Sequence, residues 1–357
     1  MADRKLATIQ TISKLEPIDG ADNIEKASIL GWSLVVKKGE FKVGDNCVYC
    51  EIDSFLPIRP EFEFLRKSSL RKLEDGTEGF RIRTVRLRKT VSQGIAFPRI
   101  ILTPEQFSKL KVGDDVTELL GVLLWQPPIP ADLKGKIKGR FPMFMPKTDE
   151  TRVQLLQSVI TRHRGSKCYI TEKLDGSSAT YYLKDGEFGV CSRNLELLET
   201  ADNAFWKVAR EMKIEEKMKQ YSVNYGWKNF AIQGELVGQG IQDNRLQIQG
   251  RKVYFFSMFD IDKFEYKSYV DFIMIVKGIM DLPIVPILRD DFILIDDIPK
   301  LIEFSIAKSL INPKIWREGI VIRPLAEKMD MQMSNEFNNG RVSFKVINPE
   351  YLIEYEE

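Results

Sequence analysis

Glu172-Lys173-Leu174-Asp175-Gly176-Ser177 places one lysine at the end of an apolar run, Cys168-Tyr169-Ile170-Thr171-Glu172, and just before a glycine turn. The run predicts a strand, so Lys173 is expected at the end of that strand, with the Asp175 carboxylate two residues further on. A lysine amine shifts its pKa readily when it is desolvated or placed among cations, and the neutral amine is a nucleophile. The pattern K-x-D-G also describes many surface turns, so the hexapeptide alone favours a turn.

Four later stretches extend this pattern into an ordered set. Residues 230–236 predict a buried strand that carries the Glu235 carboxylate near its end, and residues 253–260 predict an aromatic strand. Residues 317–323 predict a strand with a carboxylate at its start, and residues 341–347 predict a strand with an inward-facing lysine. Each stretch is weak evidence by itself, whereas five stretches in a fixed order are strong evidence.

Length and composition fit a soluble enzyme with two domains. The chain has 357 residues, of which 43% are hydrophobic and 29% charged. Its formal net charge of +2 confines any affinity for nucleic acid to a local patch. Neither a signal peptide nor a membrane-spanning run is evident, so an intracellular protein is expected. The four cysteines are interpreted as free thiols, and the single histidine, His163, argues against a zinc site.

A stretch rich in proline, lysine and glycine divides the chain. Residues 125–139 lack the pattern of any regular element, so we interpret residues 125–145 as a linker. Residues 1–124 contain short alternating runs between Gly/Asp turns. The predicted strands are residues 32–36, 46–52, 79–83 and 94–98. Short strands without a long helix predict a small all-β barrel, for which the OB-fold is the nucleic-acid-binding candidate.

One segment of the first domain is strongly basic. Five cations lie within nine residues: Arg81, Arg83, Arg86, Arg88 and Lys89. Their alternation changes parity between Arg83 and Arg86, as at a β-bulge or tight turn. The functional interpretation is a groove that follows a phosphate backbone and so binds RNA. A solvated charged face is an equal alternative, because acidic residues lie nearby in the sequence.

Residues 146–357 mix helical and hairpin patterns. Asp149 can cap a helix that ends near Gly165. The apolar residues on one face of that helix would be Val153, Leu156, Val159 and Ile160. Asp185-Gly186 predicts a two-residue hairpin turn, and residues 202–220 have a helical pattern. The expected fold class is therefore α+β, with an N-terminal all-β barrel joined to a domain of antiparallel sheets flanked by helices.

The ordered set resembles motifs I, III, IIIa, IV and V of the covalent nucleotidyltransferases, which are DNA ligases, RNA ligases and mRNA capping enzymes. The resemblance implies that residues 146–357 adopt the nucleotidyltransferase fold. DNA ligases and capping enzymes carry an OB domain after motif V, whereas here the OB-like domain precedes the catalytic one. This order looks like that of the fifth family of ATP-dependent RNA ligases, and residues 39–45 leading into residues 51–57 support the match.

The resemblance implies metal-assisted nucleotidyl transfer at Lys173. This lysine would attack the α-phosphorus of ATP, expel pyrophosphate and carry AMP. Three carboxylates from separate strands would hold the water shell of Mg²⁺ or Mn²⁺: Asp175, Glu235 and Glu318. Such an ion would lower the pKa of the lysine and stabilise the charge on the leaving group. Lys345 would contact the α-phosphate as a point charge.

Further residues are implied to bind the nucleotide. Phe256 would stack on adenine, although an aromatic residue in such a strand, considered alone, is more often core. Glu172 would face the adenine edge, Arg193 the ribose or the nucleic-acid end, and Arg152 the departing pyrophosphate. Many RNA ligases have the lysine pair K-x-K in motif V, whereas here Ser343 stands at the first position. A second cation must then come from elsewhere.

The implied activity is the joining of RNA 3′-hydroxyl and 5′-phosphate ends by a monomeric, ATP-dependent RNA ligase without a membrane partner. AMP would pass from the lysine to the RNA 5′-phosphate and then leave as the strands join. An ATP-dependent DNA or polynucleotide ligase, or a GTP-dependent capping-type enzyme, would share the lysine chemistry. A non-catalytic nucleic-acid-binding protein built on a decayed nucleotidyltransferase is the third alternative. Decay normally erases some of the metal-facing carboxylates and lysines, whereas this chain retains all three carboxylates together with Lys173 and Lys345.

Overall fold

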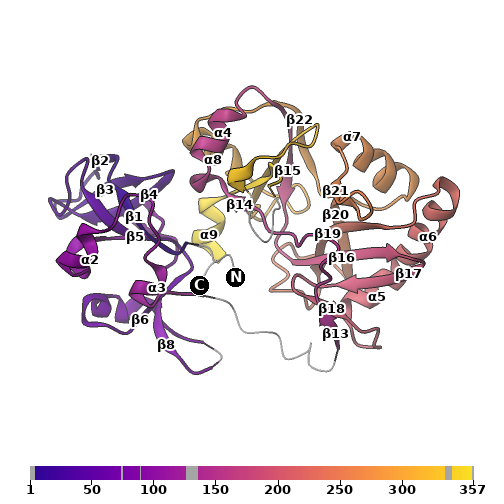
Figure 1. Ribbon diagram of the computed structural model, residues 1–357, viewed down its shortest axis with the longest axis horizontal. Coiled ribbons are helices and arrows are strands. Elements are labelled where there is room, and N and C mark those ends of the chain that lie inside the picture. Colours follow the sequence, from indigo (N-terminus) through magenta and orange to yellow (C-terminus); the bar gives the residue numbers. More distant parts are fainter. Residues whose placement is uncertain (1–4, 74, 89, 126–135, 334–339, 356–357) are drawn as a thin grey trace. The chain divides into compact units, whose positions relative to one another are not determined.

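The structure is a computed structural model that describes residues 5–73, 75–88, 90–125, 136–333 and 340–355 (Figure 1). The chain divides into two compact units. The first holds residues 1–129 together with 352–357, and the second holds residues 130–351. No helix among the described residues has the length and apolar character that crossing a bilayer requires.

The first unit is built from short strands around an apolar core. Its sheets have the strand orders β1-β5-β11, β2-β3-β4, β12-β6-β8-β7 and β10-β9. The strands are β1 (Ala7–Thr11), β2 (Lys14–Pro17), β3 (Ile24–Ile29), β4 (Trp32–Lys37), β5 (Asn46–Cys50), β6 (Ser54–Pro57), β7 (Leu70–Lys72), β8 (Glu78–Arg81), β9 (Val85–Leu87), β10 (Thr90–Ser92), β11 (Ile95–Pro98) and β12 (Leu123–Leu124). All four strands that the sequence predicts in this unit are thereby confirmed.

Helices in the first unit are short. They are η1 (Pro60–Leu65), α1 (Arg66–Ser69), η2 (Arg99–Ile101), α2 (Pro104–Ser108) and α3 (Thr117–Leu120). Helix α2 begins with a capping box in which the Thr103 side chain and the Gln106 side chain each accept from the other's backbone N–H. The buried core includes Ile9, Val48 and Phe80.

A seven-stranded antiparallel sheet forms one half of the second unit. Its order is β13-β18-β17-β16-β19-β20-β21. The strands are β13 (Ile137–Arg140), β16 (Ser177–Lys184), β17 (Glu187–Cys191), β18 (Leu195–Leu197), β19 (Phe230–Gly238), β20 (Arg251–Asp260) and β21 (Glu265–Tyr266). The hairpin predicted at Asp185-Gly186 is present, because Lys184 pairs with Glu187.

A five-stranded sheet forms the other half, in the order β14-β24-β23-β15-β22. Its strands are β14 (Thr151–Arg152), β15 (Lys167–Lys173), β22 (Ile287–Ile293), β23 (Gly319–Pro324) and β24 (Phe344–Ile347). All neighbours are antiparallel except β14 and β24, which run parallel. The strands expected around the five sequence stretches are therefore confirmed, and Lys173 is the last residue of β15.

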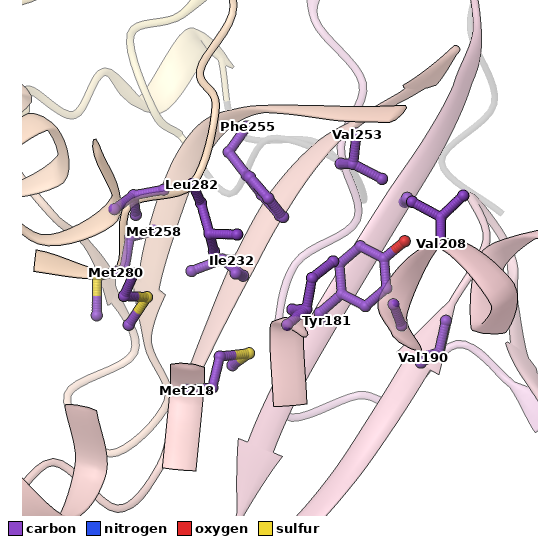
Figure 2. Packing of buried hydrophobic residues seen from close by; sticks show 14 of the residues in the cluster. Tyr181, Val190, Val208, Met218, Ile232, Val253, Phe255, Met258, Met280 and Leu282 are labelled. Atoms are coloured by element: carbon purple, nitrogen blue, oxygen red, sulfur yellow. The ribbon is translucent and has the colours of Figure 1, made fainter. Parts of the chain in front are cut away.

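Helices cover one face of each sheet. They are η4 (Val153–Leu155), α4 (Gln157–Arg162), α5 (Ala204–Glu211), α6 (Ile214–Tyr225), α7 (Tyr269–Phe272), the π-helical η5 (Ile273–Ile279), α8 (Ile298–Ser305), η6 (Met331–Met333) and α9 (Pro349–Tyr355). Helices α5 and α6 pack on the seven-stranded sheet, where Figure 2 shows Val208 and Met218 near Tyr181 and Ile232. Helices α4 and α8 pack on the five-stranded sheet through residues such as Ile160.

Two sequence predictions in this unit are wrong. The helix expected from Asp149 does not begin there, because residues 151–152 pair with β24 as strand β14 and α4 starts only at Gln157. The segment 125–145 is not irregular throughout, because β13 pairs with β18 within it. Residues 126–135 of that segment lie outside the described residues. In both cases a partner strand distant in the sequence overrides the local pattern.

Candidate active site

Each sheet of the second unit has one face that the helices leave uncovered. The polar residues of the candidate site lie on these faces. On the five-stranded sheet, Lys173 pairs in register with Gly319, and Val321 pairs with both Thr171 and Lys345. Successive side chains on a strand point to opposite faces of the sheet, whereas residues paired in register point to the same face. Lys173 and Lys345 therefore project from the same face. This is the face opposite the apolar core beneath α4 and α8.

Glu318 is the immediate partner of Lys173. Its carboxylate Oε2 lies 2.7 Å from Lys173 Nζ, and both side chains are partly buried. Gly319, beside them, allows the close strand packing, since a Cβ at this position would lie 2.3 Å from the Val346 carbonyl oxygen. The turn after Lys173 is equally tight, because a Cβ at Gly176 would lie 2.4 Å from the Leu236 carbonyl oxygen.

The electrostatic environment of Lys173 is acidic. Burial alone would lower the pKa of this amine, but the charges of Glu318, Glu235 and Asp175 outweigh burial and raise the pKa. The lysine is therefore held as an ammonium ion in the absence of another cation. Since only the neutral amine is a nucleophile, the arrangement needs something that offsets the carboxylate charge.

The neighbouring carboxylates also act on Glu235. Burial, together with the charges of Glu318 and Asp175, raises the pKa of Glu235 to about 8. Three carboxylates thus surround one lysine, a donor set that suits Mg²⁺ or Mn²⁺. In the part of the chain that the structure describes, no three acidic, histidine or cysteine side chains are grouped closely enough to ligate a metal directly.

Lys345 lies with two further basic residues. Its Nζ is 3.0 Å from Asp149 Oδ1, and the Arg193 guanidinium is 2.7 Å from Asp149 Oδ2. Arg152 is the register partner of Lys345 across β14 and β24. Burial lowers the pKa of Lys345, and the charges of Arg152 and Lys173 lower it further, while Asp149 raises it. The structure thus brings together Lys345, Arg193, Arg152 and Lys173.

A basic residue, Arg323, lies beside Ser343, which stands where the K-x-K pattern has its first lysine. Arg323 on β23 donates from Nε to Ser343 Oγ at 2.8 Å, and its side chain is only 3% exposed. Its guanidinium lies 5.5 Å from the centre of the Phe256 ring and pairs with Glu150 at 2.7 Å. Phe256 is half-buried and packs in a cluster with Leu174, next to Lys173 in the chain.

Glu172 faces a different neighbourhood from Lys173. Its Oε2 accepts from the Leu310 backbone N–H at 2.8 Å. Its Oε1 is buried and has no hydrogen-bond partner among the described residues. Burial raises the pKa of this carboxyl group, against hydrogen bonds from Ser309 and Leu310. A buried acceptor without a partner is costly, so this oxygen is suited to a donor on a ligand.

Two contributors were missed by the sequence analysis. Asp149 was interpreted as a helix cap, whereas it bridges Lys345 and Arg193. Arg245, in the loop between β19 and β20, lies 3.3 Å from Asp175 and donates to the Tyr351 hydroxyl at 3.0 Å. None of these residues belongs to a periodic pattern, and the only available signal was the unusual loop composition between residues 239 and 250.

The basic segment of the first unit is only partly presented to solvent. Arg81 is 16% exposed, lies 3.4 Å from Asp53 and stacks over Trp125 at 5.4 Å. Arg88 is exposed and adopts φ 47°, at the turn between β9 and β10. Lys89 lies outside the described residues. The parity change expected between Arg83 and Arg86 coincides with the break between β8 and β9.

A family model described as an OB-fold domain matches residues 6–99, and one described as RNA ligase matches residues 166–347. A search of the curated proteins gave no match.

Among solved structures, an apo point mutant of the Naegleria gruberi RNA ligase is 42% identical, with a TM-score of 0.86, covering 100% of this chain and 99% of that chain. The same ligase with pyrophosphate is 42% identical, with a TM-score of 0.86 and 99% coverage of each chain. A point mutant with ATP and Mn is 40% identical, with a TM-score of 0.87 and 99% coverage of each chain. The chain therefore belongs to the RNA ligase family.

Proposed function

We propose that this protein is an ATP-dependent RNA ligase in which Lys173 is the nucleophile. The observation that carries the assignment is the position of Lys173 Nζ at the end of β15, 2.7 Å from Glu318 and under the charge of Glu235 and Asp175. Solved structures of an RNA ligase with ATP and Mn, at 40% identity over nearly the whole chain, support the choice of ATP and a divalent ion.

The first step is adenylylation of Lys173. Its neutral amine attacks the α-phosphorus of ATP; a P–N bond forms, and the P–O bond to pyrophosphate breaks. The proton that the amine carries at rest must leave beforehand, and Glu318 Oε2 is the base within reach. Lys345 places its charge at the α-phosphate, and Arg152, its register partner, is near enough to accompany the departing pyrophosphate.

Asp175, Glu235 and Glu318 would hold Mg²⁺ or Mn²⁺ through the ion's water shell. When bound, this ion supplies charge that offsets the carboxylates, lowers the pKa of the Lys173 amine and stabilises the leaving pyrophosphate. The residues are suited to this task because their own charge is incompletely compensated, as the raised pKa of Glu235 indicates. Arg245 would keep Asp175 oriented from the opposite side.

The base and the sugar of the nucleotide have separate partners in this proposal. Phe256 stacks on adenine from β20, with its ring held by Arg323 on one side. The unpartnered Oε1 of Glu172 accepts from the exocyclic amine of adenine. A guanine carries a carbonyl oxygen at that position and would leave the Glu172 oxygen opposed by another acceptor, which favours ATP over GTP. Arg193 is near enough to Lys345 to reach the ribose.

The two remaining steps transfer AMP from Lys173 to an RNA 5′-phosphate and then join the strands. In the second step the P–N bond breaks and a 5′–5′ pyrophosphate bond forms. In the third step an RNA 3′-hydroxyl attacks the 5′-phosphate, and AMP leaves. Positioning and electrostatics carry most of the catalysis in such displacements. A monomer suffices, because all the groups named above come from one chain.

The first unit is the proposed RNA-binding module, with residues 1–124 as its OB-like domain, 125–145 as the connection and 146–357 as the catalytic domain. The basic segment from Arg81 to Lys89 is the proposed contact with the RNA backbone. Reversal of Arg86 and Arg88 to glutamate is expected to weaken RNA binding and to flatten its salt dependence, while Lys173 adenylylation continues. Unchanged RNA affinity with normal adenylylation would remove the segment from the interface.

The deciding experiment is incubation with Mg²⁺ and ATP or GTP labelled at the α-phosphate, followed by denaturing gel electrophoresis. Label from ATP that is absent in Lys173→Met is the expected result. Lys207→Met, on the half-exposed helix α5, serves as the matched control because it removes a lysine elsewhere in the same unit. Label from GTP would indicate a capping-type enzyme, and label that persists in Lys173→Met would refute the nucleophile assignment. Sealing of nicked RNA compared with nicked DNA then separates the two ligase classes.

A further inference from the structure

Asp149 joins two basic side chains that come from different sheets. Lys345 belongs to β24 of the five-stranded sheet, whereas Arg193 follows β17 of the seven-stranded sheet. Oδ1 of the Asp149 carboxylate accepts from Lys345 at 3.0 Å, and Oδ2 accepts from Arg193 at 2.7 Å. A single carboxylate thereby sets the distance between two cations that no strand pairing connects.

The backbone on both sides of Asp149 is anchored. Glu150 pairs at 2.7 Å with Arg323, whose side chain is 3% exposed, and Thr151 pairs with Phe344 in the parallel ladder of β14 and β24. On the other side, the hydroxyl of Thr148 forms a hydrogen bond with that of Ser178. Breaking a buried ion pair is strongly destabilising, so this segment does not withdraw easily.

This anchoring decides between two roles for the carboxylate. As a stand-in for phosphate, Asp149 would vacate its place when a nucleotide arrives, which the anchored neighbours oppose. As a fixed clamp, it would stay and leave the cations free to act, because an ammonium has three donors and a guanidinium five. One donor of Lys345 and one of Arg193 are used by Asp149, so both groups retain donors for a phosphate or ribose oxygen.

We propose that Asp149 is a positioning residue that holds Lys345 and Arg193 in their working geometry before the nucleotide binds. The inference rests on the proposed function, since it takes Lys345 and Arg193 to be nucleotide contacts. Pre-set donors of this kind are worth most in a site of low dielectric constant, where they need no reorganisation during the reaction.

Asp149 also opposes the loss of charge at Lys345. The charged groups that act on Lys345 are Asp149, Arg152 and Lys173, and burial adds to the effect of the two cations in lowering the pKa of its amine. Burial would raise the pKa of Asp149, but Lys345, Arg193 and Lys173 together lower it to about 2, so the carboxylate stays ionised across the working pH range. An amide at position 149 would keep an acceptor but remove this charge.

The test is single-turnover adenylylation of Lys173 in Asp149→Asn, measured against ATP concentration and pH. We expect the maximal rate constant to fall about tenfold or more, since a charged hydrogen-bond network is broken. We also expect an alkaline decline that begins at lower pH than in the wild-type protein, because Lys345 loses its proton sooner. Asp330→Asn is the matched control: Asp330 also accepts from two basic residues, Arg162 and His163, on the helix-covered side of the sheet.

Coupling to Arg193 separates positioning from a general effect on folding. Because Asp149 acts through Lys345 and Arg193, its substitution should cost less in an Arg193→Ala background than in the wild-type protein. Additive losses with an unchanged pH profile would refute positioning, as would a wild-type rate in Asp149→Asn. If Lys345→Ala and Arg193→Ala both adenylylate normally, the proposed nucleotide contacts fail instead. A lowered urea midpoint in Asp149→Asn does not affect the comparison, because the coupling and the pH profile are measured on folded protein.

Discussion

The two faces of the five-stranded sheet differ in almost every property, although the same strands build both. The face beneath α4 and α8 is apolar, with Ile170, Ile322 and Phe344 among its buried residues. The opposite face carries Lys173, Lys345 and the other polar residues of the site. Alternation along each strand separates the two sets, so residues that stabilise the sheet and residues proposed for chemistry are neighbours in the sequence.

The polar face has stricter pairing requirements than the apolar face. Its buried charges require partners, as the pairing of Arg323 with Glu150 and that of Arg341 with Glu327 illustrate, both with nearly buried arginines. Apolar residues on the other face need only shape complementarity and burial. A change of one residue should therefore have different consequences on the two faces, and this difference can be measured.

The largest expected effect is on the polar face. Lys173→Met should abolish transfer of AMP to the protein, a loss of at least about 10³-fold, because no other group replaces a covalent nucleophile. Label on the denatured protein measures this loss, and the unfolding temperature checks the fold. A lower unfolding temperature with a still cooperative transition is expected, because the three carboxylates lose the cation that offsets their charge.

The next largest effect is expected from a substitution that breaks a buried ion pair on the same face. Arg323→Met leaves Glu150 buried without its partner and should lower the free energy of unfolding by about 3–5 kcal/mol. Urea denaturation measures the change. The double variant Glu150→Gln, Arg323→Met should recover a substantial part of the loss. Equal destabilisation of the single and double variants would mean that packing, rather than the orphaned charge, explains the effect.

Substitution of Glu235 should change the free energy of unfolding by a smaller amount, and it should stabilise the protein. The folded-state pKa of Glu235 is raised to about 8 from 4.5, so the folded protein binds more protons than the unfolded chain between these values and loses stability as pH rises through them. Glu235→Gln should therefore stabilise the metal-free protein at pH 8.5 by about 1–3 kcal/mol, and not at pH 4. Thermal unfolding at the two pH values checks the sign. Added Mg²⁺ should narrow the difference by stabilising the wild-type protein.

The smallest effect belongs to the apolar face. Ile322→Val removes one buried methylene next to Arg323 in the sequence and should cost about 0.5–1.5 kcal/mol. Adenylylation should be unchanged, because the side chain points away from Lys173. Urea unfolding and the single-turnover rate constant measure the two quantities. A loss of rate larger than the loss of stability would mean that the two faces are not separable.

The strands of the second unit were predictable because their local signals agree with the tertiary structure. Residues 230–236 are mostly apolar, residues 253–260 are rich in aromatic residues, and turns follow both stretches. The order of the stretches predicted that Lys173, Glu235 and Glu318 come from separate strands. The structure has Lys173 in β15 and Glu235 in β19, whereas Glu318 lies directly before β23. The three side chains are within electrostatic reach of each other. The pairing of the strands in register was not predictable, since sequence periodicity assigns a face but no partner.

The remainder depended on contacts that are distant in the sequence. Residues 151–152 form a strand only because β24, almost 200 residues later, offers an open edge. Asp149 was interpreted as a helix cap for lack of this information, and its two basic partners lie 44 and 196 positions away. The cation at Ser343 was likewise hidden, because Arg323 reaches it across the sheet from the neighbouring strand.

The ion pair between Lys173 and Glu318 also makes the resting protein selective toward chemical reagents. Acylating and carbonyl reagents modify neutral amines, and the carboxylates around Lys173 keep this amine protonated. Exposed lysines elsewhere on the chain are open to the reagent and would be modified first. The proposed nucleophile is thus among the least reactive amines of the metal-free protein, and a bound divalent ion is expected to convert it into its reactive neutral form.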